Sequence, residues 1–168
     1  VSGSELSISS SGVLTFASVP DFETKSSYTA MITVSDGTNS TTQSVTVTIT
    51  DVNDVSPVFT SSASFSAAEN QTGVGTVTAT DTDSSSLTFS VSGSELSISS
   101  SGVLTFASAP DFETKSSYTA TVTVSDGENS TTQNISVTVT DANDSAPTIR
   151  SGSSFTAAEN QTGIGSVS

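Results

Sequence analysis

Apolar and small polar residues alternate along most of the chain, in short stretches that polar turns separate. Successive side chains of a β-strand point to opposite faces, so this period of two predicts strands with one buried face. The predicted inward positions are Phe65 and Ala67; Val77 and Ala79; Leu87, Phe89 and Val91; Leu96 and Ile98; Leu104 and Phe106; Tyr118, Ala120, Val122 and Val124; and Ile135, Val137 and Val139. About seven short strands without any helical period predict an all-β antiparallel sandwich.

The chain also repeats itself at a shift of ninety residues. Residues 1–78 and 91–168 differ at 20 of 78 positions, which leaves 58 identical, and such self-similarity is typical of a tandem array. A polar segment, Asp51-Val52-Asn53-Asp54, returns as Asp141-Ala142-Asn143-Asp144 and reads as a linker. We therefore expect the later part of one unit at 1–50, a complete unit with its preceding linker at 51–140, and a linker with the start of a third unit at 141–168.

Composition removes several function classes. The chain has no Cys, His or Trp, which excludes disulfides, thiolate or imidazole zinc sites and Ser-His-Asp triads. Three basic residues face seventeen acidic ones, and a net charge of -14 repels nucleic acid and anionic membrane surfaces. We expect a protein that is not an enzyme and does not bind nucleic acid.

The acidic residues are not scattered as they would be on a merely solvated surface. Only Glu5, Glu95 and Glu128 lie outside short recurring clusters at predicted loop ends. The clusters are Ala-Glu-Asn at Glu69 and Glu159, Asp-Thr-Asp at Asp81 and Asp83, Asp-Phe-Glu at Asp21 with Glu23 and at Asp111 with Glu113, Asp-Gly at Asp36 and Asp126, and the two linkers. Neighbouring carboxylates at roughly 4 Å repel by on the order of 1 to 4 kcal/mol, so a divalent cation is expected among them.

These segments resemble the calcium motifs of cadherin repeats, in the order of that family. The family pattern x-Glu-Asn, Asp-x-Asp, Asp-Arg-Glu, Asp-x-Gly and Asp-x-Asn-Asp-Asn-x-Pro corresponds to Glu69, Asp81 with Asp83, Asp111 with Glu113, Asp126, and Asp141 through Pro147. Phe22 and Phe112 replace the Arg, and Val55 and Ser145 replace the last Asn, at positions that give no side-chain ligand in the family. The resemblance covers the whole chain and implies tandem cadherin-like, Ig-like Greek-key domains of seven strands with Ca²⁺ bound between them.

The resemblance also implies the ligands. The first junction would collect Asp21, Glu23, Asp51, Asn53, Asp54, Asp81, Asp83 and Asp126, and the second Glu69, Asp111, Glu113, Asp141, Asn143 and Asp144. Backbone carbonyls of Val52, Val55 and Ala142 are further candidates. The next Asp-x-Asp would follow residue 168, so we expect fewer or weaker ions at the second junction.

Calcium that is shared between adjoining units would turn a flexible chain into a rod. Near-identical repeats without Cys resemble the giant surface adhesins of bacteria, which implies an extracellular or cell-surface role in adhesion and biofilm formation. The expected partners are neighbouring repeats of the same chain, and surface glycans or other cells. A calcium-dependent carbohydrate-binding module is the alternative, and an exposed aromatic platform would indicate it. The incomplete units at either end could also complete each other between chains.

Overall fold

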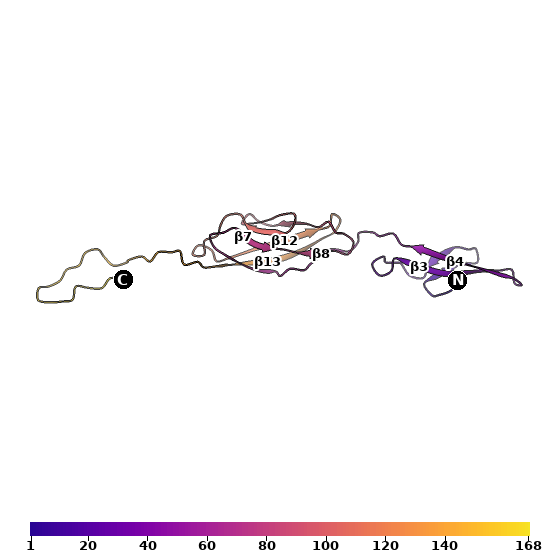
Figure 1. Cartoon of the computed structure of the whole chain (residues 1–168), viewed down its shortest axis with the longest axis horizontal. Coiled ribbons are helices and arrows are strands. Elements are labelled where there is room, and N and C mark those ends of the chain that lie inside the picture. Colours follow the sequence, from indigo (N-terminus) through magenta and orange to yellow (C-terminus); the bar gives the residue numbers. More distant parts are fainter.

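The computed structural model describes all residues, 1–168, and contains thirteen strands and no helix. None of its elements is a helix of the length and apolarity that a membrane span needs. The strands are β1 (Leu6–Ile8), β2 (Leu14–Phe16), β3 (Ser27–Ser35), β4 (Ser40–Thr48), β5 (Val58–Phe59), β6 (Ser64–Ala68), β7 (Gly73–Thr76), β8 (Ala79–Thr80), β9 (Thr88–Val91), β10 (Leu96–Ile98), β11 (Val103–Phe106), β12 (Ser117–Ser125) and β13 (Ser130–Thr140). Figure 1 shows an elongated molecule, with β1–β4 at one end, β5–β13 in the middle and residues 141–168 extending beyond them.

The strands β5–β13 form the sandwich that the sequence predicts. One sheet has the order β6-β13-β12-β9 and the other has the order β10-β11-β7, while β5 pairs with β8. All of these pairs are antiparallel except β6 with β13, which is parallel. The all-β sandwich is therefore confirmed, and one parallel pair departs from a purely antiparallel arrangement.

The core consists of inward side chains from both sheets. Along β13 the buried residues Ile135, Val137 and Val139 alternate with exposed Ser136 and Thr138, as the period of two predicts. The largest fully buried side chains include Leu104, Val77, Val122 and Val124. Tyr118 packs against this cluster and its ring meets Phe106 edge-on at 5.0 Å between centroids.

The predicted strand at Val77 and Ala79 is interrupted. β7 ends at Thr76 and β8 begins at Ala79, although Val77 is buried and its N–H still donates to the Gly102 carbonyl at 2.8 Å. A Cβ at residue 102 would lie 2.2 Å from the Val77 carbonyl oxygen, and Gly102 has a φ of +86°. The positive φ and this close approach both require a glycine at this position.

The strands β1–β4 have the same local structure as β10–β13 but lack covering strands. The register Tyr28↔Val47 in β3 and β4 matches Tyr118↔Val137 in β12 and β13. The burial differs, since Val34 is 65% exposed and its counterpart Val124 is 0% exposed. The repeat thus places one sequence in two environments.

This pair of positions gives a stability test with an internal control. Val124→Ala removes two carbon groups from a fully buried site, at about 0.8 kcal/mol each plus a cavity term, so we expect a loss of about 2 kcal/mol in unfolding free energy. Val34→Ala should change that free energy by less than about 0.5 kcal/mol, because its side chain is already largely in water. Urea unfolding followed by circular dichroism measures both. Equal losses would contradict the burial difference.

Candidate functional site

Three separate segments bring carboxylates together between β4 and the middle sandwich. Glu23 lies in the turn before β3, Asp51 follows β4 in the linker, and Asp83 follows β8. One carboxylate oxygen of each lies within 4.8 Å of the others. Neither of the two ion pairs of the chain, Lys25 with Glu5 and Lys115 with Glu95, neutralises this cluster. The site is therefore a concentration of negative charge that draws on both units and their connector.

Asp81 and Asp83 shape the loop that enters this cluster. The Asp81 Oδ1 accepts hydrogen bonds from the N–H groups of Asp83 and Ser84, at 2.8 and 3.0 Å. The Asp83 Oδ2 accepts from the N–H groups of Asp54 and Val55, at 2.9 and 2.7 Å, and so holds the linker against the middle sandwich. The Asp81 Oδ2 is buried and has no hydrogen-bond partner. A buried carboxylate oxygen without a donor fits a position for a cation.

Asp126 lies at the same end of the sandwich and caps its own turn. Burial raises the pKa of Asp126, but hydrogen bonds from the N–H groups of Asn129 and Glu128, at 2.6 and 2.8 Å, lower the pKa by more. The Asn129 side-chain amide also donates to the carbonyl of Asn53 at 3.1 Å and lies 3.5 Å from the carbonyl of Val55. Sequence reasoning missed Asn129, although the recurrence of Asp-Gly-x-Asn at Asp36 was a usable signal.

Asp21 and Glu23 have opposite electrostatic environments. Hydrogen bonds from the Thr24 hydroxyl and then its N–H, at 2.9 and 3.2 Å, lower the pKa of Asp21. A hydrogen bond from its own backbone N–H lowers the pKa of Glu23, yet desolvation, the charge of Asp83 and contacts with Asp21 and Asp51 outweigh it and raise that pKa to about 7. The raised pKa thus reflects desolvation first and the repulsion between neighbouring carboxylates second.

A second cluster forms where β13 leaves the middle sandwich. Oxygens of Glu69, Glu113 and Asp144 lie within 4.8 Å of one another. Glu69 is only 4% exposed, and its two oxygens accept hydrogen bonds from the N–H groups of Ala142 and Phe112, at 2.7 and 2.8 Å. The linker therefore docks on Glu69 in the way that the first linker docks on Asp83.

Glu113 and Asp111 at the second cluster have pKa shifts in the same directions as Glu23 and Asp21 at the first. A backbone hydrogen bond lowers the pKa of Glu113, while desolvation and the charges of Glu69 and Asp141 raise it above its usual value. Hydrogen bonds from Thr114 lower the pKa of Asp111. The Asn70 amide, which sequence reasoning also missed, donates to the Asp144 Oδ2 at 2.6 Å.

Two expected ligands stand apart from this network. Asn143 and the carbonyl of Val52 form no hydrogen bond, and both residues are exposed. Ala142 enters the second cluster through its N–H and not through its carbonyl. The remaining expected side chains lie in or beside the two clusters, and their roles as ligands stay predictions. The donor set of carboxylate and carbonyl oxygens fits a hard cation such as Ca²⁺.

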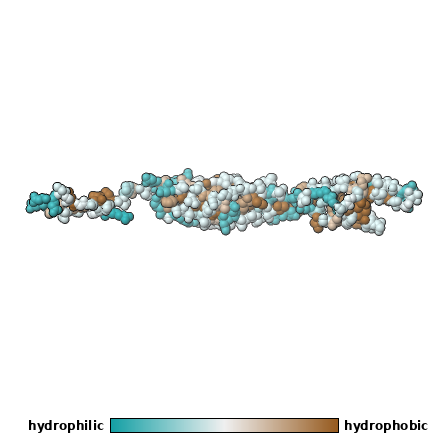
Figure 2. Space-filling view, turned by 90° about the horizontal axis from the view of Figure 1, so that it is seen from below, coloured by the Kyte–Doolittle hydropathy of each residue, from teal (hydrophilic) through white to brown (hydrophobic).

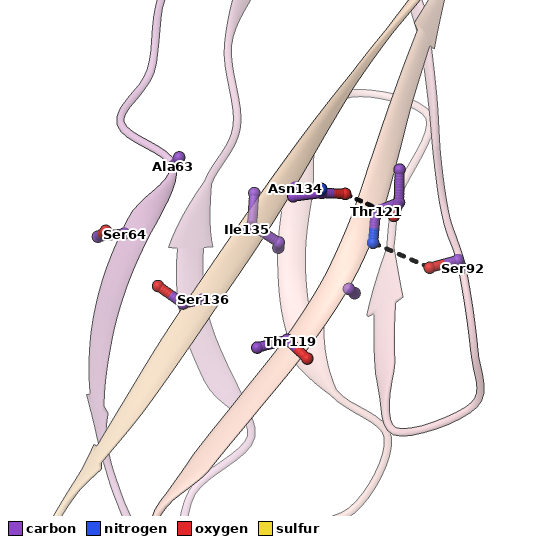
Figure 3. Close-up of a pocket in the computed structure, with 9 residues that line it drawn as sticks. Ala63, Ser64, Ser92, Thr119, Thr121, Asn134, Ile135 and Ser136 are labelled. Carbon is purple, nitrogen blue, oxygen red and sulfur yellow. Dashed lines mark hydrogen bonds between the residues drawn. The ribbon is translucent and has the colours of Figure 1, made fainter.

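A separate groove of about 700 Å³ crosses the outer face of the four-stranded sheet. Figure 3 shows its lining, which is mainly hydroxyl and amide groups from Ser64, Ser92, Thr119, Thr121, Asn134 and Ser136. The Thr121 hydroxyl donates to the Asn134 amide oxygen at 2.8 Å, so these groups satisfy one another. No aromatic side chain lines the groove, which leaves the carbohydrate-binding alternative without its expected platform.

Comparison with known proteins identifies the fold family. The family model described as bacterial Ig domain matches residues 53–140. No curated protein sequence matches the chain.

Solved structures that resemble the chain are extracellular cadherin domains. Domains 3–6 of protocadherin gamma B2 are 27% identical with a TM-score of 0.77, over 89% of this chain and 42% of that one. The protocadherin gammaB7 EC3–6 cis-dimer structure is 30% identical with a TM-score of 0.74, over 89% of this chain and 41% of that one. Mouse cadherin-23 EC22–24 is 28% identical with a TM-score of 0.70, over 83% of this chain and 50% of that one. This chain thus spans half or less of each, and the cadherin-like repeat is confirmed.

The raised pKa of Glu23 gives a pH prediction for the metal-free protein. A folded-state pKa of about 7 against an ordinary 4.5 means that the folded junction binds the proton more tightly than the unfolded chain does. The stabilisation is complete below pH 4.5 and is lost as pH rises through about 7. Carbon-13 NMR titration in a chelator should give Glu23 a midpoint near 7, and Asp83→Asn should lower it.

The control for this titration is Glu159→Gln, which removes one charge from the exposed C-terminal segment. It should leave the midpoint of Glu23 unchanged. An ordinary midpoint for Glu23 in the unsubstituted protein would show that the carboxylates do not converge.

Proposed function

Because the chain belongs to the bacterial Ig domain family and has the fold of cadherin repeats, we propose that it is part of a calcium-stiffened extracellular adhesion rod. Residues 1–50, 51–140 and 141–168 are the successive units of this rod, and Ca²⁺ binds at the two junctions. The parent protein is a large surface or secreted adhesin that acts in cell attachment and biofilm formation. Its role is mechanical and adhesive rather than catalytic.

One observation carries this proposal: the first cluster takes its carboxylates from two successive units and from the linker that joins them. Glu23 belongs to the first unit, Asp51 to the linker and Asp83 to the second unit. A cation held by all three fixes the angle between the units. Within one unit the same three carboxylates would stabilise a loop and do nothing for the shape of the rod.

Repulsion between the carboxylates favours the binding of a cation, and the calcium concentration decides where binding occurs. Desolvation, the charge of Asp83 and contacts with Asp21 and Asp51 raise the pKa of Glu23, and a divalent cation would replace the repulsion among these carboxylates with attraction. Extracellular calcium modules typically bind at about 10⁻⁴ to 10⁻³ M. The rod would then be stiff outside cells and slack where calcium is scarce.

The second junction has carboxylates from the middle unit and from the linker that follows it. Glu69 and Glu113 come from the middle unit, and Asp144 comes from the linker. We propose that Asp111, Asp141 and Asn143 join them.

Small-angle X-ray scattering tests the stiffening. The maximum dimension should be narrowly distributed in millimolar Ca²⁺ and broaden in a chelator, because the first junction then bends. Asp83→Asn should show the broad distribution in both conditions, since it removes a carboxylate from the cluster and weakens linker docking. Glu159→Gln, with the same charge change, should behave as the unsubstituted protein. Identical distributions with and without Ca²⁺ would contradict the proposal.

Isothermal calorimetry tests whether each cluster is a separate calcium site. We expect Asp83→Asn to remove the binding events of the first junction and Glu113→Gln to remove those of the second, because each substitution takes one carboxylate from its own cluster. If either substitution left the number of bound ions unchanged, the cluster that it alters would not be a calcium site.

A further inference from the structure

The side-chain amide of Asn129 lies among four oxygen atoms at the first junction. Its Nδ2 is 3.1 Å from the carbonyl oxygen of Asn53, 3.4 Å from the Oδ1 of the same residue, 3.5 Å from the carbonyl oxygen of Val55 and 3.4 Å from the Asp126 Oδ2. Three of these oxygens belong to the linker. An amide NH₂ group has two hydrogens, so four acceptors are more than it can satisfy.

Three of the four distances are longer than an ordinary hydrogen bond. Only the Asn53 carbonyl lies at the distance of a usual N–H···O contact. Calcium lies about 2.3 to 2.6 Å from its oxygen ligands, so two ligands at right angles to each other are about 3.3 to 3.7 Å apart. The amide thus lies where a ligand of a cation would lie beside the Asn53 Oδ1, the Val55 carbonyl and the Asp126 Oδ2.

Hydrogen bonds of the turn and of the linker hold this group of oxygens in place. The Asp126 Oδ1 accepts from two N–H groups of its own turn, which leaves its Oδ2 beside the amide of Asn129. The N–H groups of Asp54 and Val55 donate to Asp83, so a second loop fixes the same stretch of the linker. Figure 2 shows hydrophilic surface where the middle sandwich meets the first unit, so ions in solution have access to this region.

An asparagine amide can present either of two atoms to such a group of oxygens. Its χ2 torsion is broad and roughly two-fold, and a half-turn exchanges the donor Nδ2 for the acceptor Oδ1 in nearly the same volume. Without a cation, an Oδ1 at this position would face four other oxygens and be repelled, so the Nδ2 faces them. Beside a cation the preference reverses, because carbonyl oxygens are ligands of Ca²⁺ and an NH₂ group is not.

We infer that Asn129 is a two-state group of the first junction, and this inference rests on the proposed calcium function. In the metal-free protein its Nδ2 donates to the Asn53 carbonyl and keeps the linker on the middle unit. In the calcium-bound protein the amide has turned over, and its Oδ1 is a ligand together with the Asn53 Oδ1, the Val55 carbonyl and the Asp126 Oδ2. Asn129 lies outside the acidic motifs on which the resemblance to cadherins rests.

The two states give the junction a linker that is positioned before the ion arrives. Asn53, Val55 and Asn129 are half-buried, so water competes only in part for these contacts. Calcium then has less of the linker to order, which favours binding. The same residue adds an oxygen to the site once the ion is present.

Asn129→Asp and Asn129→Ala separate the two roles, because Asp keeps an oxygen and loses the donor, whereas Ala loses both. The backbone groups of residue 129 that close the turn are the same in both variants. In a chelator, the amides of Asp54 and Val55 should exchange hydrogen about 2- to 10-fold faster in either variant, since one hydrogen bond of the linker is lost. NMR-detected hydrogen exchange measures this.

Calcium calorimetry in a Glu113→Gln background measures the ligand role at the first junction. Asn129→Asp should bind calcium at least as tightly as the parent, because its carboxylate supplies the oxygen. Asn129→Ala should bind about 10-fold more weakly or worse, since a ligand matters at least as much as the groups that orient ligands. In the unsubstituted chain, the side-chain NH₂ signals of Asn129 should be protected from exchange in a chelator and lose that protection in saturating Ca²⁺.

Asn39→Asp is the matched control. It makes the same charge change in the corresponding turn of the first unit, and the pairing of Ser35 with Ser40 and of Ser27 with Thr48 puts that turn at the end of the hairpin opposite the linker. It should leave the linker exchange and the calcium affinity unchanged.

Unchanged exchange of the linker amides in both Asn129 variants would overturn the donor role. Unchanged calcium affinity in Asn129→Ala, or NH₂ signals that stay protected in saturating Ca²⁺, would overturn the ligand role while the proposed function stands. If the unsubstituted chain bound no calcium, the proposed function and the ligand role would both be overturned.

Discussion

Repulsion between carboxylates that the fold forces together is the interaction on which this molecule depends. Glu23, Asp51 and Asp83 approach within 4.8 Å, and no cationic side chain joins them. Two hydrogen bonds to the Asp83 Oδ2 hold the linker in place at the same time, so the negative charge cannot relax by simple separation. Under the proposed function a cation relieves this repulsion, and the shape of the rod then depends on whether calcium is present.

The sandwich makes this arrangement possible by sending its loops to two opposite ends. The loops after β8 and β12 place Asp81, Asp83 and Asp126 beside the first linker. The segments after β6 and β11 place Glu69 and Glu113 beside the second. The middle unit thus has one acidic cluster where the chain enters it and one where the chain leaves it, and the molecule is elongated along that line (Figure 1).

Much of this could be predicted from the sequence because the relevant signals are local and repeated. The alternation at Ile135, Val137 and Val139 indicated a strand with one buried face, and the structure buries all three. The acidic motifs indicated where charge would gather, and Glu23, Asp51 and Asp83 do meet. The ninety-residue shift indicated a repeated sequence, and β3 pairs with β4 in the same register as β12 with β13.

What could not be predicted depends on contacts between distant segments. The strand at Val77 is interrupted where the backbone of Gly102 lies close to the Val77 carbonyl, and no pattern around Val77 records that contact. β5 at Val58 and Phe59 is too short to show an alternation. Asn129 and Asn70 bind linker groups 74 to 76 residues away in sequence, so their roles emerge only after the sandwich has formed.

Residual dipolar couplings measure the central claim most directly, because they report whether two parts of a chain share one orientation. In millimolar Ca²⁺ the amides of β3–β4 and of β12–β13 should fit a single alignment tensor, and in a chelator they should need two. Two independent tensors in saturating Ca²⁺ would show that the clustered carboxylates do not lock the joint, and would contradict the account.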